Sequence, residues 1–468
     1  MVSGALQLNS EWQSQATEAL AIKKLTRKAI AEKLEISPGS VSKFVNGKPI
    51  AASNFIRICQ ELELDWGIAS QAEPQKTDMG QFKFKASNFK ANPGGELAPE
   101  EIMGRESLIA QIWERLEQQS LIFIGERRIG KSSTLKKITI EPQQDMLPIY
   151  RDLEGIRTPI EFVETVWQDV EIYLKDVGKA IKTRTYLSNL QGSQFTGYSF
   201  PEIAADSWKE LLALVISDLI DLQTQQIVFI WDEIPHMLEN FPQQSAMEML
   251  DTLRSLRQTY PDLRMIFSGS IGLHHIFKNL QQAGYRNDPT NDMYTIDGQP
   301  LILEDATELA ANLIAGEGIA TFNLEKTARD IAEAVDCIPF YIHHLVNQLK
   351  TCNEEVTHSV IIYTVERCLL DPLNPWKMDH YRERINNYYT ADQKPYALSI
   401  LDLMAINPPT TFQKVWQILY SDPQTNDKEM ARTIIRLLMK DYYLVQTGSI
   451  YSFRYDLVRL YWRLSRGL

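Results

Sequence analysis

The sequence predicts an α/β fold in which helices cover both faces of a doubly wound parallel sheet. Three apolar-rich runs of strand length support this prediction, at 121–124, 226–231 and 263–267, and polar residues follow each run directly. Such runs are typical of strands buried on both faces, because helices cover both sides of a parallel sheet. The length of 468 residues suggests about three domains, at roughly 150 residues per domain.

A phosphate-binding motif follows the first apolar run. Residues Gly125 to Ser132 read GERRIGKS, a match to GxxxxGK(S/T) placed between a strand and a helix. The two glycines let backbone N–H groups turn towards a phosphate, and the positive end of the following helix faces the same point. We expect Lys131 to reach the β- and γ-phosphates of ATP and Ser132 to bind Mg²⁺. The cofactor-binding residues predicted in this loop are Gly125, Arg128, Gly130, Lys131, Ser132 and Ser133.

Adjacent carboxylates, Asp232 and Glu233, end the second run. Asp232 would hold Mg²⁺ through water, and Glu233 would orient and activate the attacking water. Together with the loop, this pair predicts a P-loop NTPase of the ASCE type, which carries a catalytic glutamate; a core strand ending in a solvated acidic pair is the alternative. The third run would lie between the other two strands. Ser268 and Ser270 at its end would then contact the γ-phosphate or its water, or simply form a turn.

A basic segment lies near the N-terminus of an acidic chain. Residues 22–58 carry eight cations against two anions, whereas the whole chain has a formal net charge of −12. Three amphipathic helices are expected between residues 25 and 62, and the second begins at Pro38 after a capping Ser37 and ends at Asn46-Gly47.

This segment resembles the helix-turn-helix of the lambda-repressor-like family. The resemblance implies that the second helix enters the major groove of double-stranded DNA while basic residues meet phosphates. A small helical adaptor for protein contacts is the alternative. The DNA-binding candidates are Ser40, Ser42, Lys43, Asn46 and Lys48.

Two further segments flank these motifs. Residues 102–106 read IMGRE, about 20 residues before the phosphate-binding loop, and residues 335–341 read VDCIPFY. With the loop and the acidic pair, they resemble STAND-class and archaeal-type AAA-like ATPases. The resemblance implies that Arg105 lies near the nucleotide and that Pro339, in a helical lid, lies close to the adenine. Cys337 stands where the family has glycine.

The C-terminal sequence predicts a winged helix, from helical patterns at 391–405, 412–420 and 428–440 and a hairpin over 443–453. Its arginines could contact nucleic acid, or the module could pack within the chain. The predicted organisation is a helix-turn-helix domain at 1–70, a linker at 71–100, the ATPase core at 101–295, a helical lid at 296–375 and the winged helix at 376–468.

Arg254 and Arg257 lie where AAA+ relatives place an arginine finger that reaches a neighbouring subunit. Solvated arginines on a helix are the other interpretation. The four cysteines have no CxxC spacing and no histidines at zinc-site distances, so we expect buried thiols rather than a metal site. No apolar run reaches about 18 residues, so a soluble, cytoplasmic protein without membrane segments is expected.

Three functions follow from these patterns. The first is a slow, Mg²⁺-dependent ATPase that acts as a molecular switch, coupling nucleotide state to modules that bind DNA or protein partners in signalling, regulation or defence. The second is an AAA+ motor that assembles on DNA as a homo-oligomer. The third is a DNA-binding regulator that does not hydrolyse its nucleotide, although Glu233 speaks against it because a pure binder needs no residue that activates water.

Overall fold

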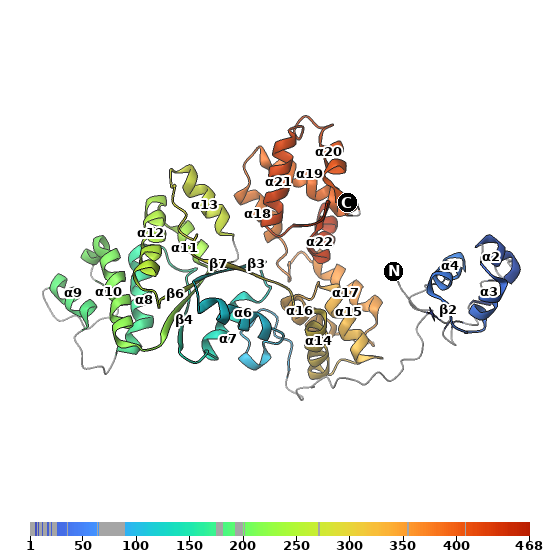
Figure 1. The fold of residues 1–468 in the computed structure, drawn as a ribbon, viewed down its shortest axis with the longest axis horizontal. Helices are drawn as coiled ribbons and strands as arrows, with labels where there is room; N and C mark the ends of the chain where they lie inside the picture. The colour runs from blue at the N-terminus through green and yellow to red at the C-terminus, as the bar shows by residue number, and fades with distance from the viewer. Residues whose placement is uncertain are drawn as a thin grey trace. The chain divides into compact units, whose positions relative to one another are not determined.

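The computed structural model describes most of the chain as two compact units, within residues 1–83 and 84–468 (Figure 1). Each unit is described by itself. The described residues are 5–6, 8, 12, 16–17, 20, 26–34, 36–62, 64, 89–174, 181–191, 200, 202–269, 272–352, 355–407 and 409–468.

Among the described residues of the N-terminal unit, three short helices surround its core. They are α2 (Arg27–Lys33), α3 (Pro38–Val45) and α4 (Ala52–Leu62), and β1 (Ala5–Leu6) pairs antiparallel with β2 (Ile50–Ala51). The Ser37 hydroxyl accepts a hydrogen bond from the N–H of Ser40 and so caps α3, as its position before a proline predicted. Val41 and Phe44 are fully buried, which leaves the polar residues of α3 on the outer side.

A five-stranded parallel sheet lies at the centre of the larger unit, in the order β4-β5-β6-β3-β7. As the sequence predicted, β6 lies between β3 and β5. Because the strands are parallel, their carboxyl ends meet along one edge of the sheet. The strands are β3 (Leu121–Gly125), β4 (Met146–Asp152), β5 (Gln226–Asp232), β6 (Arg264–Ser268) and β7 (Tyr294–Gly298).

Helices cover both faces of this sheet, because each central strand is apolar on both sides. In β5, Val228 and Ile230 pack on one face, whereas Phe229 and Trp231 pack on the other. Burying such a side chain stabilises the fold by about 1.5–3 kcal/mol. The first face carries α6 (Glu106–Leu116) and α7 (Lys131–Ile140). The second carries α8 (Pro159–Leu174), α10 (Trp208–Leu222), α11 (Ile234–Asn240), α12 (Gln243–Thr259) and α13 (Leu273–Gln282) (Figure 1).

Residues Lys182–Gln191 form α9, although their sequence is polar with scattered aromatic residues, a composition more typical of a loop. The carboxylate of Asp218 accepts hydrogen bonds from the N–H groups of Lys182 and Thr183, at 3.0 and 2.8 Å. This cap comes from α10, so the local sequence carries no sign of it. Residues 192–199 lie outside the described part of the chain.

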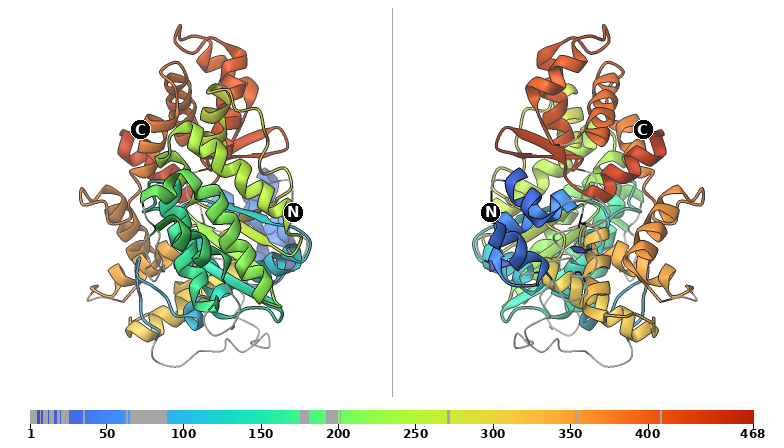
Figure 2. Two further views of the ribbon diagram at one scale, coloured as in Figure 1. Left: turned by 90° about the vertical axis from the view of Figure 1, so that its left-hand side faces the viewer. Right: turned by 90° about the vertical axis from the view of Figure 1, so that its right-hand side faces the viewer.

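Residues 301–468 form what we call the C-terminal region, drawn in yellow-orange to red in Figure 2. A single hydrophobic core runs through it. The segments expected as separate lid and winged helix share this core. Its small sheet has the order β8-β10-β9, and Gly448, with φ +62°, turns the hairpin. No helix among the described residues is long and apolar enough to cross a bilayer. The elements are α14 (Leu303–Glu317), α15 (Leu324–Ala334), α16 (Pro339–Leu349), α17 (His358–Leu370), α18 (His380–Tyr388), α19 (Gln393–Ile406), β8 (Thr410–Thr411), α20 (Phe412–Leu419), α21 (Lys428–Lys440), β9 (Leu444–Thr447), β10 (Ile450–Phe453) and α22 (Asp456–Arg466).

Residues 89–92, which fall in the expected linker, pack against the C-terminal region. Phe89 is buried in its core, and the N–H of Ala91 donates to the carboxylate of Glu317 at 2.9 Å. A short 3₁₀ helix, η1 (Pro99–Glu101), then leads into α6. The other 3₁₀ helix, η2 (Glu202–Ser207), precedes α10.

Candidate functional site

The phosphate-binding loop connects β3 to α7 at the carboxyl edge of the sheet. Gly130 has φ +97° and is the residue immediately before α7, a conformation in which most side chains would be strained. Arg128 also has a positive φ, of 67°. The helix begins at Lys131, so its free N–H groups face the loop and form a site suited to an anion.

The ammonium group of Lys131 lies inside the loop. It donates to the carbonyl oxygens of Gly125 and Glu126, at 2.8 and 2.9 Å, and is almost fully buried. Burial lowers the pKa of Lys131, and the nearby carboxylates of Glu233, Glu126 and Asp232 oppose that shift. A buried cation surrounded in this way can pair with the negative charge of a phosphate chain.

Ser132 and Asp232 meet at the position expected for a metal. The Ser132 hydroxyl donates to Oδ2 of Asp232 at 2.6 Å, and the Tyr150 hydroxyl donates to the same oxygen at 3.3 Å. A hydroxyl and a carboxylate are oxygen ligands of the kind that Mg²⁺ prefers, so these side chains fit that ion. Tyr150 belongs to β4, and the sequence pattern gave no indication of its contact.

Glu233 follows the end of β5 with φ +54°. Its carboxylate lies 3.9 Å from Nε2 of His236 and lines the same cavity as Lys131. A β-carbon at Gly269 would lie 2.5 Å from Cδ of Pro235 and 3.5 Å from Oε2 of Glu233, so β6 ends close against the acidic pair. The chain therefore brings a carboxylate to the same cavity as the phosphate-binding loop.

Ser268 ends β6, and its register partner is Phe123 in β3. Its hydroxyl is buried and has no hydrogen-bond partner among the described residues. A buried polar atom without a partner is costly, by about 1–3 kcal/mol, and this one stands at the strand edge where the γ-phosphate or its water was expected. Ser270, the second residue predicted to sense the phosphate, lies outside the described residues.

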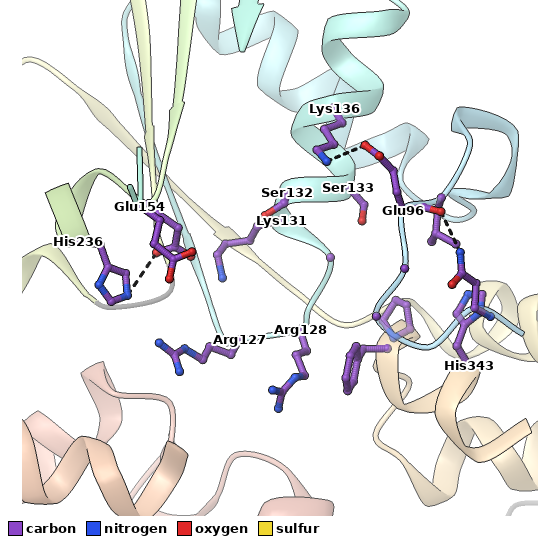
Figure 3. A pocket seen from close by; sticks show the side chains of 18 residues that line it. Glu96, Arg127, Arg128, Lys131, Ser132, Ser133, Lys136, Glu154, His236 and His343 are labelled. Atoms are coloured by element: carbon purple, nitrogen blue, oxygen red, sulfur yellow. Dashed lines mark hydrogen bonds and ion pairs between the residues drawn. The ribbon is translucent and has the colours of Figure 1, made fainter. Parts of the chain in front are cut away.

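A cavity of about 590 Å³ lies in front of the loop, a size typical of small-ligand sites. Figure 3 shows Lys131, Ser132 and Ser133 at the head of α7, with Glu154 and His236 on one side and Glu96 and His343 on the other. Its lining residues are Asn92, Gly94, Gly95, Glu96, Leu97, Arg127, Arg128, Gly130, Lys131, Ser132, Ser133, Lys136, Glu154, Glu233, His236, Pro339, Phe340 and His343.

The wall formed by residues 92–97 was missed in the sequence, where these residues look like a linker. Lys136 of α7 pairs with Glu96 at 2.7 Å (Figure 3), and the N–H of Asn92 donates to Nδ1 of His343 at 3.2 Å. These contacts fasten the segment to α7 on one side and to α16 on the other. The polar and glycine-rich composition is typical of any loop, so no local signal could have placed it at the cavity.

Arg105 and Arg128, both predicted at the nucleotide, occupy different positions. Arg105 is buried and does not line the cavity. It donates to the carbonyl oxygens of Ile129 and Gln299, and a β-carbon at Gly130 would lie 3.4 Å from its Nη2. Burial lowers its pKa to about 10. Arg105 therefore supports the loop from behind.

Arg128 connects the loop to the C-terminal region. It lines the cavity, donates to the carbonyl oxygens of Trp376 and Lys377 at 2.7 and 3.1 Å, and lies over the ring of Phe340 at 4.7 Å. Pro339 lines the same side of the cavity at the first turn of α16.

The interpretation of Arg257 as a solvated arginine is wrong. Its side chain is buried, forms an ion pair with Asp292 at 2.8 Å, donates to the carbonyl oxygen of Pro289 and lies 5.4 Å from the ring of Phe267. Its guanidinium is therefore paired within its own chain. Arg254 is half-buried and donates to the carbonyl oxygen of Asp288.

The DNA-binding candidates lie on the outer side of α3 and just after it. Lys43, Asn46 and Lys48 are exposed, and Ser40 and Ser42 are half-buried. The hydroxyl of Ser40 shares a hydrogen bond of 2.9 Å with that of Ser37, so Ser40 is engaged in the helix cap.

Comparison with known proteins confirms the predicted P-loop NTPase fold. Residues 114–277 match the family model described as AAA domain. A Walker-type ATPase of Pyrococcus abyssi is similar over 82% of this chain and 100% of its own, with a TM-score of 0.55 and 15% identity. At that identity the likeness shows the fold alone.

Two other solved structures align over similar lengths but less closely. The ORC2 protein of Aeropyrum pernix, in its ADPNP–ADP complexes, covers 82% of this chain and 97% of its own, at 9% identity and a TM-score of 0.44. The RuvB Holliday junction branch migration motor of Thermotoga maritima covers 80% and 96%, at 10% identity and a TM-score of 0.35. No curated protein matches the chain.

Proposed function

We propose that this chain binds ATP with Mg²⁺, hydrolyses it slowly, and acts as a molecular switch that couples nucleotide state to its flanking modules. The observation that carries the proposal is the convergence of α7 and β5 on one cavity. The head of α7 contributes Lys131 and Ser132, Glu233 follows the end of β5 and lines the same cavity, and Ser132 meets Asp232 at 2.6 Å.

Each side chain has one role in this proposal. Lys131 and the N–H groups of the loop bind the β- and γ-phosphates, while Ser132 and Asp232 hold the metal. Bound ATP supplies the reactive phosphoanhydride, and Mg²⁺ neutralises charge on its phosphates. Glu233 orients a water and accepts its proton. Asn92, residues 94–97, Pro339 and Phe340 line the other part of the cavity, and we assign the base to it.

The contacts between the phosphate-binding loop and the C-terminal region favour a switch over a motor. Arg128 links the loop directly to Trp376 and Lys377, so a change at the phosphates would act on a region with its own continuous core. A motor that assembles as a ring needs an arginine presented to its neighbour, and Arg257 is committed within its own chain. Arg254 would have to fill that role alone.

For the N-terminal unit we propose a helix-turn-helix that binds double-stranded DNA through Lys43, Asn46 and Lys48, with Ser42 beside them. Their exposure on one side of α3 supports this role. We assign the winged helix to packing within the chain. Several of its arginines are paired with carboxylates, including Arg454 with Asp297 and Arg466 with Asp402.

The test is nucleotide binding and turnover in matched variants. We expect Lys131→Ala to weaken ATP binding by at least about tenfold, because the charged hydrogen bonds to the phosphates are lost. Glu233→Gln should keep binding and lower turnover by about 10²–10⁴-fold. Titration of a fluorescent ATP analogue and phosphate release would measure both. Lys137→Ala is the control, since it removes the same charge from α7 outside the cavity.

Turnover and solution mass measured with and without duplex DNA separate the candidates. Slow turnover that DNA does not stimulate agrees with the switch. Strong stimulation together with ATP-dependent assembly, both lost in Arg254→Ala, would favour the motor. Binding of ATP with no phosphate release, unchanged in Glu233→Gln, would leave only a nucleotide-stabilised regulator.

A further inference from the structure

Glu126, the second residue of the phosphate-binding loop, is held by side chains from far along the chain. Its carboxylate is 1% exposed. Arg384 contacts it with two N–H groups, Nη2 to Oε1 at 3.0 Å and Nη1 to Oε2 at 3.3 Å, and Nε2 of His380 lies 3.7 Å from Oε1. Both residues belong to α18 of the C-terminal region (Figure 1). The motif pattern leaves this loop position open to any residue.

The same residue also shapes the phosphate site through its backbone. The carbonyl oxygen of Glu126 accepts a hydrogen bond from Nζ of Lys131 at 2.9 Å. Its carboxylate accepts a second one from the N–H of Arg127 at 2.7 Å. Glu126 therefore lies between α18 and the lysine that we place at the phosphates.

The buried carboxylate of Glu126 depends on its cationic partners to stay charged. Burial alone would raise the pKa of Glu126, but Arg384 and His380 hold it well below its usual range. Removing one member of such a pair leaves an uncompensated charge in the interior, which is far more costly than removing both. The pair between Glu126 and Arg384 therefore ties the conformation of the loop to α18.

Arg384 is itself fixed by the C-terminal region. Nη1 donates to the carbonyl oxygen of Asp441, and its guanidinium lies 5.8 Å from the rings of Tyr381 and Tyr443. The carboxylate of Asp441 forms hydrogen bonds with Nε2 of His275 at 2.8 Å and with Nε2 of His274 at 3.1 Å. It also accepts a hydrogen bond from the hydroxyl of Tyr389 at 2.7 Å. Those histidines belong to α13, which follows the end of β6.

We propose that Arg384 is a positioning residue for the phosphate-binding loop: it fixes Glu126, and through Glu126 it sets the position of Lys131. This inference rests on the proposed function and adds the contact by which the C-terminal region and the nucleotide act on each other. Coupling of this kind is reciprocal. A shift of α18 weakens phosphate binding, and a bound nucleotide that favours this loop conformation stabilises the docking of α18.

The first test uses the full chain and needs no nucleotide. In Arg384→Met, and more mildly in Arg384→Lys, backbone amides of residues 125–130 should exchange hydrogen at least about tenfold faster than in the wild type. Arg382→Met is the matched control, because Arg382 lies on the same helix but packs over Trp462 at 5.8 Å. Equal exchange in Arg384→Met, Arg382→Met and the wild type would overturn the proposal.

The second test is a double-mutant cycle on ATP affinity. Arg384→Met should weaken ATP binding at least about tenfold, whereas in a Glu126→Gln background the same change should cost much less, because no buried charge is left unpaired. If every folded variant binds ATP with wild-type affinity, the positioning role of Arg384 is refuted, but the proposed function is not. If the wild-type chain binds no ATP, the proposed function is refuted. The hydrogen-exchange measurement then still tests whether Arg384 holds the loop. If Arg384→Met does not fold, Arg384→Lys and the double variant decide.

Discussion

At the scale of single residues, His343 fixes one wall of the cavity through a hydrogen bond that depends on its protonation. The N–H of Asn92 donates to Nδ1 of His343, so this nitrogen must carry no proton. Burial lowers the pKa of His343 to about 4, and the neighbouring His344 acts in the same direction. At neutral pH the imidazole is therefore uncharged and available as an acceptor.

This arrangement predicts a loss of stability in acid. The folded chain holds the pKa of His343 below the value of about 6.5 of an unfolded chain, so the unfolded state binds more protons. The contribution of His343 to the free energy of unfolding is fully present above about pH 6.5. It is lost as the pH falls towards 4, by up to about 1.4 kcal/mol per pH unit. Urea unfolding of the wild type and His343→Asn between pH 4.5 and 7.5 measures this effect.

His343→Asn keeps an acceptor near Nδ1 but cannot titrate, so its stability should fall less in acid. His344, whose pKa is also lowered to about 4, leaves the variant some pH dependence. Parallel stability profiles for the two proteins would contradict the role given to His343.

At the scale of elements, the end of α15 shows why a glycine is expected before the lid proline. Asp336 and Cys337 both have positive φ, of 52° and 56°, and the N–H of Cys337 donates to the carbonyl oxygen of Ala332 at 2.8 Å. The chain makes a left-handed turn here before α16 begins at Pro339. Cys337 thus carries backbone strain that glycine would avoid.

Comparing two substitutions isolates that strain. Neither Cys337→Gly nor Cys337→Ala retains the thiol, and they differ only by a β-carbon. The alanine variant should be less stable than the glycine variant by about 1–2 kcal/mol, because alanine is disfavoured at positive φ. Thermal or urea unfolding of both variants measures the difference. Equal stability, or a more stable alanine variant, would show that the turn is not strained at this position.

At the scale of the whole molecule, the chain divides into two units with separate cores. The buried residues of the N-terminal unit form one cluster, and none of them belongs to the clusters of residues 84–468. The phosphate-binding loop, the acidic pair and the described cavity wall all lie in the larger unit.

A chain lacking residues 1–83 should therefore keep its nucleotide site. We expect its ATP affinity and the thermal transition of the larger unit to stay within about twofold and a few degrees of the full chain, because no core residue is lost. Affinity for duplex DNA should fall to background, and the salt dependence of DNA binding should disappear with it. Retained DNA binding in the shortened chain would disprove the role proposed for α3.

Local patterns were enough to predict the strands β3, β5 and β6, the strand–loop–helix at Lys131 and the carboxylates that end β5, because each is a run of apolar side chains followed directly by polar residues or a motif. The position of β6 between β3 and β5 came from the P-loop fold that these motifs indicate, and β7 was not predicted. The boundaries of α3 and the hairpin at Gly448 were predicted for the same reason, since caps and turns depend on a few neighbouring residues.

The sequence by itself thus determined the fold of the ATPase core and the chemical groups at its centre. Only the tertiary structure decided which distant residues support them. Asn92 donates a hydrogen bond to His343, Asp218 caps α9, Asp292 pairs with Arg257, and Arg384 pairs with Glu126. These partners lie 35 to 258 residues apart. Periodicity specifies which face of an element is buried, but the pairing of buried polar groups depends on how the elements pack, and no local pattern records that.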